Sequence, residues 1–600
     1  MEYSIYKDTT PIETVNKIKS VLKELSIDIN EKEITHKEND VTSVRLTVKG
    51  TQIGTNGKGT NRENALASGY SEFMERLQTN YLFSFRTKEI DEVEADVKSL
   101  PDYFESVLKK KLNKKFRKLI IIKNKIKQIK SGENYEVSED ESKTECVKFY
   151  ALNAKKEVLI PINDLRYIQT TTGLAAGNTF EEASVQALSE LCERYSMKQI
   201  LTKKIRLPEV PLKYYQERTS IVELVKFIES QGYRVTIKDA SLGTKHRGKI
   251  NINPPVICTL FERKDADGED CQLRFGSHPS LFVAIERTLT EFMQGYSLEE
   301  EKEREYVKLF RDLKTSSIND KLSDFFHSVV VFSKHKKDYS FLFDKKSDYE
   351  FDEATWLIDQ KSSNKEMLKR LCTIGKEVYI RNYSFLGFPT VNIFIPELIC
   401  SRDLDEKYLD NEIKISELEL EILSGEVKSH SVKELLKIFE YGLSTVYEYH
   451  LSSVPLCYLA FLCAVMLKNN KKALEYYKQI KVNIDFNKKY GEENILKNNI
   501  LIEYYDLLSK WGNDKKIFNI LYETFEKQIK MHYNIDKEYF DKKAFERLFI
   551  NTLTSRKILK LLTDNSKIGN NFDKKEHIVN NIVFIYNKNR LSHDIFEGKN

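Results

Sequence analysis

The sequence lacks several signatures that would assign a function at first sight. Its eight cysteines are scattered, without a CxxC pair or a histidine nearby, so a zinc site is not indicated and reduced, mostly buried cysteines are expected. No charged leader followed by an apolar core opens the chain, and no run is long and apolar enough to span a bilayer. We therefore expect a cytoplasmic protein without a membrane anchor.

An excess of charge of one sign is also missing. The chain has 96 basic and 91 acidic residues, a net charge of +5 on 600 residues. This gives no general case for nucleic-acid binding, and no direct DNA binding is expected. One basic run, from Lys109 to Lys130, contains no acidic residue. A solvated helix face is the preferred interpretation of this run, and contact with RNA or an acidic partner is the alternative.

A Walker-type phosphate loop is absent, although one stretch suggests it. Residues 54–77 read GTNGKGTNRENALASGYSEFMERL, a glycine-rich run with a lysine that leads into a helical pattern. The Walker motif needs four residues between its first glycine and the Gly-Lys pair, and then Ser or Thr. Here only two residues separate Gly54 from Gly57, and Gly59 follows Lys58. A nucleotide bound at this stretch must be held by other means.

The chain does contain enough apolar residues, 40%, for real cores, and its length favours more than one domain. Up to about residue 400, amphipathic helical stretches alternate with the β-rich runs VRLTVKG, EVLIPI, VICTLFE, EVYIRNY and VNIFIP. From about residue 431, helix follows helix, in a pattern that loosely resembles a tetratricopeptide (TPR) pair. We predict an α+β fold, with a mixed core of sheets and helices over residues 1–410 and an all-α, TPR-like domain over residues 425–600.

Three segments far apart in the chain share the pattern A-x6-E-x2-[E/Q]. The copies begin at Ala65, Ala183 and Ala284. Their acidic and amide positions are Glu72 and Glu75, Glu190 and Glu193, and Glu291 and Gln294. On a helical wheel each segment has one apolar side, which we expect to be buried. The opposite side carries small residues near the start of the helix and acidic residues further along.

Convergence of these faces would bring carboxylates close together. Clustered carboxylates repel one another and take up protons or cations, and ligands that are all oxygen suit Mg²⁺. The positive charge that a polyphosphate needs is available from Lys58, Arg76, Arg194 and Arg287. For any single helix, ordinary solvent-facing glutamates are the alternative. Three copies favour a magnesium-nucleotide site without a Walker loop.

The segments TNGKGTNRENALASGYSEFMERLQTNY, GLAAGNTFEEASVQALSELCERY, DASLG and FGSHPSLFVAIERTLTEFMQG resemble the YcaO superfamily. Its members bind ATP through an unusual fold and hold Mg²⁺ with glutamate-bearing helices. The resemblance implies that the magnesium ligands are Glu72, Glu75, Glu190, Glu193 and Glu291. It implies nucleotide contacts from Lys7, Thr14, Lys58, Ser68, Asn178, Glu182, Arg194, Arg287 and Gln294, and charge stabilisation during catalysis from Arg76, Arg194 and Arg287.

The resemblance also implies a function. Family members use ATP to activate a backbone amide, and the subgroup closest to this sequence contains the accessory factor for β-methylthiolation of a small-subunit ribosomal protein by the radical-SAM enzyme RimO. We therefore expect an ATP-hydrolysing accessory factor and, as in similar proteins, a homodimer. Thioamide or azoline formation on a peptide, or a nucleotide-bound scaffold, are the alternatives.

Two departures from the family pattern limit these expectations. Ala175 stands where similar proteins have a hydroxyl, which removes one nucleotide contact. Azoline-forming members end in a proline-rich tail, and no proline follows Pro455 here. Cyclodehydration of Cys, Ser or Thr is therefore not expected.

Overall fold

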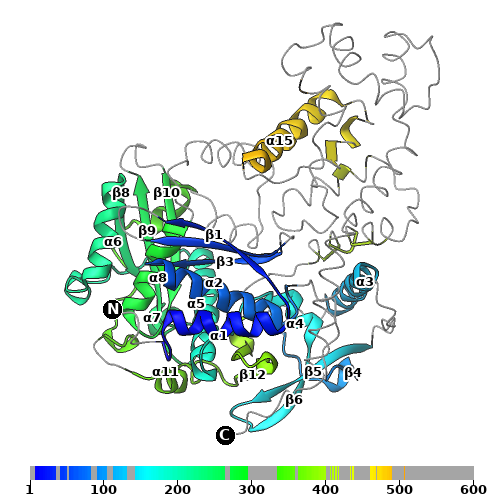
Figure 1. Ribbon diagram of the computed structural model, residues 1–600, viewed down its shortest axis with the longest axis horizontal. Helices are drawn as coiled ribbons and strands as arrows, with labels where there is room; N and C mark the ends of the chain where they lie inside the picture. The colour runs from blue at the N-terminus through cyan, green and yellow to red at the C-terminus, as the bar shows by residue number, and fades with distance from the viewer. Residues whose placement is uncertain are drawn as a thin grey trace. The chain divides into compact units, whose positions relative to one another are not determined.

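The computed structural model describes residues 7–35, 41–49, 53–82, 91–104, 112–131, 142–263, 270–294, 334–358, 362–399 and 469–489, with isolated residues between 406 and 506. The chain divides into two compact units, one made of residues 1–300, 320–406 and 574–600 and the other of residues 301–319 and 407–573. The described sheets all belong to the first unit (Figure 1). Among the described residues, no helix is long and apolar enough to cross a bilayer.

The largest sheet has six antiparallel strands in the order β4-β5-β12-β13-β7, with β6 paired to β5. These strands are β4 (Val93–Asp96), β5 (Lys143–Ala151), β6 (Lys156–Pro161), β7 (Leu174–Ala176), β12 (Tyr379–Asn382) and β13 (Thr390–Phe394). Every residue of β13 is buried, because α5 (Phe180–Lys203) packs on this strand and on β7. β13 thus lies inside the sheet, between β12 and β7, and is covered by α5.

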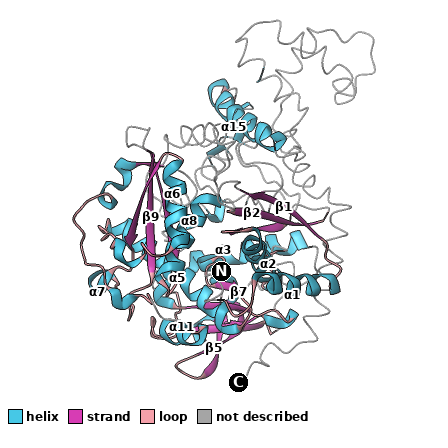
Figure 2. Cartoon of the chain, turned by 60° about the vertical axis from the view of Figure 1, so that its left-hand side comes forward, coloured by secondary structure: helices cyan, strands magenta, loops and turns pink. Residues whose placement is uncertain are grey.

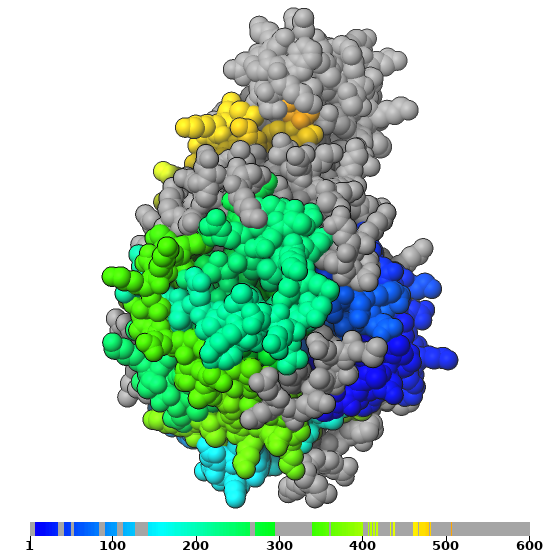
Figure 3. All heavy atoms as spheres, turned by 90° about the vertical axis from the view of Figure 1, so that its left-hand side faces the viewer, coloured from blue at the N-terminus to red at the C-terminus, as the bar shows by residue number. Residues whose placement is uncertain are grey.

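A second sheet has four strands in the order β11-β10-β9-β8. They are β8 (Tyr233–Asp239), β9 (Val256–Arg263), β10 (Asp270–Ser277) and β11 (Lys334–His335). One face packs on α5, and the other is covered by α6 (Thr219–Ser230) and α8 (Leu281–Gln294). Figure 3 shows the side of the molecule on which α6, in teal, reaches the surface. The helix α5 therefore lies between the four-stranded and the six-stranded sheet.

A three-stranded antiparallel sheet consists of β1 (Ile29–Thr35), β2 (Thr42–Val48) and β3 (Gly54–Gly59), and it packs against α1 (Pro11–Glu24) and α2 (Arg62–Gln78). The glycine-rich run that suggested a phosphate loop is the strand β3. A Cβ at Gly57 would overlap the backbone of Ala65 and Gly69 on α2. The glycines of this run allow a close strand-helix approach, which sequence reasoning missed.

Capping residues explain where the helices begin. Thr10 and Glu13 form a capping box at the start of α1, where Pro11 is the first helical residue. The side chains of Asn61 and Thr179 accept hydrogen bonds from backbone N–H groups in the first turns of α2 and α5.

The remaining elements are α3 (Asn113–Ser131), α4 (Ile162–Gln169), α7 (Gly243–His246), α11 (Asn364–Leu371), α15 (Asn470–Lys489) and the 3-10 turns η2 (Val97–Ser99), η4 (Leu212–Tyr214), η5 (Lys336–Leu342), η6 (Glu353–Thr355), η7 (Ser384–Leu386) and η8 (Pro396–Leu398).

Two buried ion pairs lie outside the three motif helices, in the part of the first unit that we call the scaffold. Arg381 on β12 is 0% exposed, and its terminal nitrogens lie 2.6 and 2.8 Å from the carboxylate oxygens of Asp91. Arg117 on α3 pairs with the buried Asp164 on α4, with Nη1 at 2.9 Å from Oδ1. The described part of the basic run is thus an amphipathic helix with one packed side, which includes Phe116.

These observations confirm the predicted core of mixed sheets and helices. Each of the five predicted β-rich runs overlaps a strand: β2, β6, β9, β12 and β13. In the C-terminal part, α15 is a helix as predicted, but most residues of the predicted TPR-like domain lie outside the described residues. The all-α character of that domain and the limits 1–410 and 425–600 stay predictions.

Candidate functional site

The three motif helices are built alike, each following a strand of a different sheet. β3 leads into α2, β7 into α5 and β10 into α8, and Figure 2 shows α8 and α5 beside β9. A Cβ added to Gly59, Gly177 or Gly276 would lie 2.5, 2.7 and 2.7 Å from the backbone of the first alanine of the following motif. Glycine is needed at these positions because the preceding chain lies against the start of the helix there. The acidic residues follow two turns further along each helix.

On α2, the two motif carboxylates share one arginine. Arg76 lies with Nη1 at 3.0 Å from Oε1 of Glu75 and with Nη2 at 3.5 Å from Oε1 of Glu72. Its guanidinium also lies over the ring of Tyr81, at 5.9 Å from the ring centroid. The hydroxyl of Tyr81 donates to the carbonyl of Thr170 at 2.6 Å. Arg76 is therefore positioned from two sides.

On α5, the arrangement is repeated with longer distances. Arg194 lies with Nη2 at 3.8 Å from Oε1 of Glu190 and with Nη1 at 3.7 Å from Oε1 of Glu193. The backbone N–H of Gly173, in the turn before β7, also donates to the Glu190 carboxylate. The two carboxylates of α5 thus form longer ion pairs with Arg194 than the carboxylates of α2 form with Arg76.

Electrostatic interactions show that α2 and α5 bring their acidic sides together. Burial raises the pKa of Glu75 to about 8, which Arg76 opposes, and the charges of Glu190 and Glu72 raise it further. Burial likewise raises the pKa of Glu190, with Arg194 opposing this and Glu193 adding to it. Burial and neighbouring like charges both disfavour ionisation of a carboxyl group. α2 and α5 therefore bring together more carboxylates than their two arginines neutralise, and Glu75 is the most deeply buried of these carboxylates.

The third helix meets the glycine-rich strand through an ion pair. Lys58 of β3 pairs with Glu291 of α8, and α8 also packs on β3. Burial lowers the pKa of Lys58 to about 8, with Glu193 and Glu72 opposing the shift and Arg287 adding to it. Lys58 therefore lies within electrostatic reach of all three motif helices.

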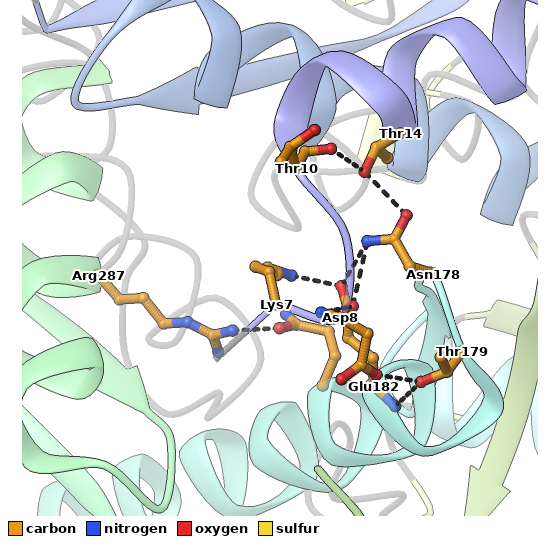
Figure 4. A network of polar contacts seen from close by, with 9 residues as sticks. Lys7, Asp8, Thr10, Thr14, Asn178, Thr179, Glu182 and Arg287 are labelled. Atoms are coloured by element: carbon orange, nitrogen blue, oxygen red, sulfur yellow. Dashed lines mark hydrogen bonds and ion pairs between the residues drawn. The ribbon is translucent and has the colours of Figure 1, made fainter. Parts of the chain in front are cut away.

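The N-terminal segment is tied to the start of α5 (Figure 4). Nζ of Lys7 lies 2.9 Å from Oε1 of Glu182, and the backbone N–H of Asp8 donates to the other carboxylate oxygen at 3.1 Å. Asn178 donates to Glu182 at 3.1 Å, and the hydroxyl of Thr14 lies 2.8 Å from Oδ1 of Asn178. The pKa of Glu182 is lowered because these donors, first among them Lys7, outweigh its burial. Four predicted nucleotide contacts thus form one network.

Arg287 points toward this network from α8 (Figure 4). Its Nη1 donates to the carbonyl of Ser277 at 2.7 Å, and its Nη2 donates to the side chain of Gln186 on α5. The neighbouring His278 is buried, and its Nδ1 accepts the backbone N–H of Ser280 at 3.0 Å. Burial and the charges of Arg287 and Lys7 lower the pKa of His278 well below its usual range. A neutral imidazole therefore stands beside the two cations.

Some predicted positions are not brought into this arrangement. Ser68 is exposed on α2, one turn before Glu72. Gln294 ends α8, and its side chain lies outside the described residues. Ala175 is buried in β7 opposite Val391. Within the described ranges, no three His, Cys, Asp or Glu side chains converge closely enough to hold a metal ion.

Residues 56–399 match the family model described as "YcaO cyclodehydratase, ATP-ad Mg2+-binding". The chain belongs to the YcaO family. The family description confirms ATP and Mg²⁺ as the predicted cofactors. The predicted resemblance is confirmed as well, because the matched region contains the strands and helices that carry the three motifs.

Two curated proteins are similar to this YcaO chain. The "Ribosomal protein S12 methylthiotransferase accessory factor YcaO" of Escherichia coli strain K12 is 28% identical over 461 residues, which is 72% of each chain. An "Uncharacterized protein" of Haemophilus influenzae is 29% identical over 419 residues, 65% of each chain.

Solved structures with similar folds are also YcaO proteins or heterocyclases. A "Heterocyclase in complex with substrate and Cofactor" has a TM-score of 0.47 at 18% identity, over 67% of this chain and 54% of the other. The YcaO protein of Methanopyrus kandleri bound with AMPPCP and Mg²⁺ has a TM-score of 0.41 at 17% identity, over 65% of this chain and 91% of the other.

The donor set of this YcaO site fits Mg²⁺ in its chemistry. Its ligand candidates are all carboxylates, which Mg²⁺ prefers together with phosphate oxygens. The buried Oε1 of Glu75 accepts no hydrogen bond and meets Nη1 of Arg76 as an ion pair. The carboxylates are turned toward the arginines of their own helices, which explains why the described side chains do not converge on one point.

Sequence reasoning missed some participants near the site. The motif alignment did not single out His278, although the histidine lies in the turn before the third helix and was part of the quoted segment FGSHPS. Gly173 was missed because it contributes a backbone N–H, which leaves no side-chain signal. Tyr81, which lies against Arg76, follows α2 outside the motif.

Proposed function

We propose that the three motif helices form a Mg-ATP site and that the protein hydrolyses ATP there. The observation that carries this proposal is the excess of partly buried carboxylates over arginines on α2 and α5, expressed in the raised pKa values of Glu75 and Glu190. Such charge is costly in the free protein and is compensated by a bound divalent cation. Membership in an ATP- and Mg²⁺-binding family supports the same conclusion.

The residues divide into two roles in this proposal. Glu72, Glu75, Glu190, Glu193 and Glu291 would hold Mg²⁺, which supplies charge neutralisation at phosphate oxygens. Arg76, Arg194, Arg287 and Lys58 stabilise the negative charge of the triphosphate and of the phosphoryl group during transfer. Nucleotide contacts come from Lys7, Thr14, Ser68, Asn178, Glu182 and Gln294. In this proposal positioning and charge stabilisation supply the catalysis.

We further propose that the protein assists β-methylthiolation of a small-subunit ribosomal protein, together with RimO, and acts as a homodimer. The relationship to the Escherichia coli accessory factor, over 72% of both chains, supports this role. ATP would serve to activate a backbone amide.

A second candidate is modification of the backbone of a separate peptide, as a thioamide or an azoline. The word cyclodehydratase in the family description favours this alternative. A scaffold that binds ATP without turnover is a third possibility, and release of ADP by the purified protein separates it from the first two.

The deciding experiment is the intact mass of the ribosomal protein in cells with and without this gene. Deletion is expected to lower the methylthio-modified fraction, and expression of the wild-type gene is expected to restore it. Restoration by a Glu190→Gln variant would show that ATP turnover is not needed for the role. An unchanged mass spectrum on deletion would remove the accessory role and leave the nucleotide site standing.

A further inference from the structure

The chain reverses direction after α2 and returns Tyr81 to Arg76. Asn80 has a φ of 64°, in the left-handed region that asparagine tolerates at helix ends. The backbone N–H of Leu82 then donates to the carbonyl of Arg76 at 2.9 Å. The ring centroid of Tyr81 is 5.9 Å from the Arg76 guanidinium, within the range of a cation–π contact. The end of α2 thus places an aromatic ring against an arginine of the site.

The hydroxyl of Tyr81 is anchored on a strained turn. It donates to the carbonyl of Thr170 at 2.6 Å. Thr170 follows α4 with φ 57° and ψ -129°, a combination that glycine usually provides at the second position of a tight turn. The backbone N–H of Thr172 closes this turn on the carbonyl of Gln169 at 3.2 Å. Such a conformation of a threonine persists only where the surrounding structure holds it.

The six-stranded sheet holds this turn. Nε2 of the buried Gln169 donates to the carbonyl of Ile393 on β13 at 2.8 Å and also to the carbonyl of Thr172. The backbone N–H of Ile393 donates to the carbonyl of Gly173 at 2.8 Å. The acceptor of the Tyr81 hydroxyl is therefore fixed to the sheet rather than to α2 itself.

This anchor differs from the ion pairs of Arg76. The guanidinium lies 3.0 Å from Glu75 and 3.5 Å from Glu72, and in the proposed Mg-ATP site both carboxylates would be shared with the cation. The ring of Tyr81 and the carbonyl that anchors it carry no net charge, so a cation does not compete for this contact. Tyr81 is thus suited to keep Arg76 in place both in the free site and in the loaded site.

We infer that Tyr81 is a positioning residue of the nucleotide site, which holds the Arg76 guanidinium in one orientation through its hydrogen bond to Thr170. The inference rests on the proposed hydrolysis of ATP, in which Arg76 stabilises the phosphoryl group during transfer. Positioning of this kind affects the transition state more than ground-state binding, because the charge of Arg76 is present in either case.

The first test compares wild type with Tyr81→Phe, which keeps the ring and removes the hydroxyl. We expect kcat for Mg-ATP hydrolysis to fall about three- to tenfold, the effect of one lost hydrogen bond. The dissociation constant of Mg-AMPPCP, measured by titration calorimetry, should stay within about twofold of the wild-type value. In an Arg76→Gln background, Tyr81→Phe should change the residual rate by less than about twofold, because it acts through Arg76.

The matched control is Tyr349→Phe. The Tyr349 hydroxyl also donates to a backbone carbonyl, that of Asp239, at 2.6 Å and outside the motif helices. This variant should keep the wild-type kcat. An unchanged kcat in Tyr81→Phe would overturn the inference, as would an equal loss of kcat in Tyr349→Phe. Weakening of Mg-AMPPCP binding by the same factor as kcat would also overturn it.

A second test needs no nucleotide. Ligand-free Tyr81→Leu and Arg76→Gln should each lower the melting temperature. The double variant should lower it by less than the sum of the two, because both changes remove the same contact. Additive losses would overturn the inference. Wild type that releases no ADP would overturn the proposed function, and the ligand-free comparison would still decide whether Tyr81 holds Arg76.

Discussion

The acidic helices and the six-stranded sheet both bury charge, but they compensate it differently. In the sheet, both terminal nitrogens of the buried Arg381 face Asp91 at 2.6 and 2.8 Å, and the pKa of Asp91 is lowered because these bonds outweigh its burial. On α2, burial and the neighbouring carboxylates raise the pKa of Glu75 to about 8. The Arg381–Asp91 pair of the sheet is complete in itself, whereas the acidic helices leave charge for a ligand to compensate.

The largest expected effect in this comparison follows removal of one site carboxylate. Glu190→Gln should abolish Mg-dependent ATP hydrolysis, with a loss of at least about a hundredfold, typical when electrostatic stabilisation of a transition state is lost. The measurement is release of ADP with and without Mg²⁺. Glu181→Gln, in the first turn of the same helix and outside the motif, is the control and should keep wild-type activity. Hydrolysis by Glu190→Gln at the wild-type rate would contradict the metal role.

The scaffold side of the comparison is tested by breaking its buried pair. Arg381→Gln should lower the free energy of unfolding by about 3–5 kcal/mol, because it leaves Asp91 buried without its partner. Denaturant unfolding measures this change. The exposed pair of Lys143 and Glu94, at 2.7 Å, gives the control: Glu94→Gln should cost less than about 1 kcal/mol. Similar costs for both variants would show that burial of the pair is unimportant.

A smaller effect is expected in the pH dependence of stability. Between its usual pKa of 4.5 and about 8, folded Glu75 holds a proton that the unfolded chain releases. Its contribution to stability is therefore present below pH 4.5 and is lost as the pH rises toward 8. Melting temperatures across this range, without ligand, should fall less steeply in Glu75→Gln than in wild type. A decline that remains in the variant is expected from Asp164 and Asp239, whose pKa values burial raises to about 6 and 7.

Adding Mg-AMPPCP to these melting experiments gives a second comparison of wild type with Glu75→Gln. Cation binding favours ionised carboxylates, so wild type should lose much of its pH slope and Glu75→Gln should change little. An identical slope for both proteins, with and without ligand, would show that Glu75 is not the buried charge that matters.

The smallest expected effect concerns the N-terminal network. The side chain of Lys7 is 46% exposed, and its partner Glu182 is buried. Lys7→Met should therefore weaken Mg-AMPPCP binding only about two- to fivefold, the range of a partly exposed ion pair. Titration calorimetry measures the change, and Lys17→Met on the following helix is the control. A loss of about a hundredfold or more, the range of a broken buried ion pair, would contradict this rank.

Much of this site was predicted from the sequence because its signals are local. The spacing A-x6-E-x2-[E/Q] places the alanine and the glutamates on one helix face, and α2, α5 and α8 have that face. The failed Walker spacing excluded a phosphate loop, and β3 is a strand. Gly173 and Tyr81 were not predicted, because a backbone N–H leaves no side-chain pattern and Tyr81 follows the motif.

The sequence by itself determined which helices carry acidic faces, whereas β3, β7 and β10, the strands that precede these helices, were not among the predicted β-rich runs. Only the tertiary structure decided that α2 and α5 face each other, that Lys7 reaches Glu182 and that Lys58 meets Glu291, contacts that span 175 and 233 positions. The physical reason is that periodicity fixes the direction of a side chain within one element, whereas the order and packing of three sheets fix which elements meet. The raised pKa of Glu75 follows from its burial and from the nearby charge of Glu190 on α5, and the sequence of α2 alone predicts neither.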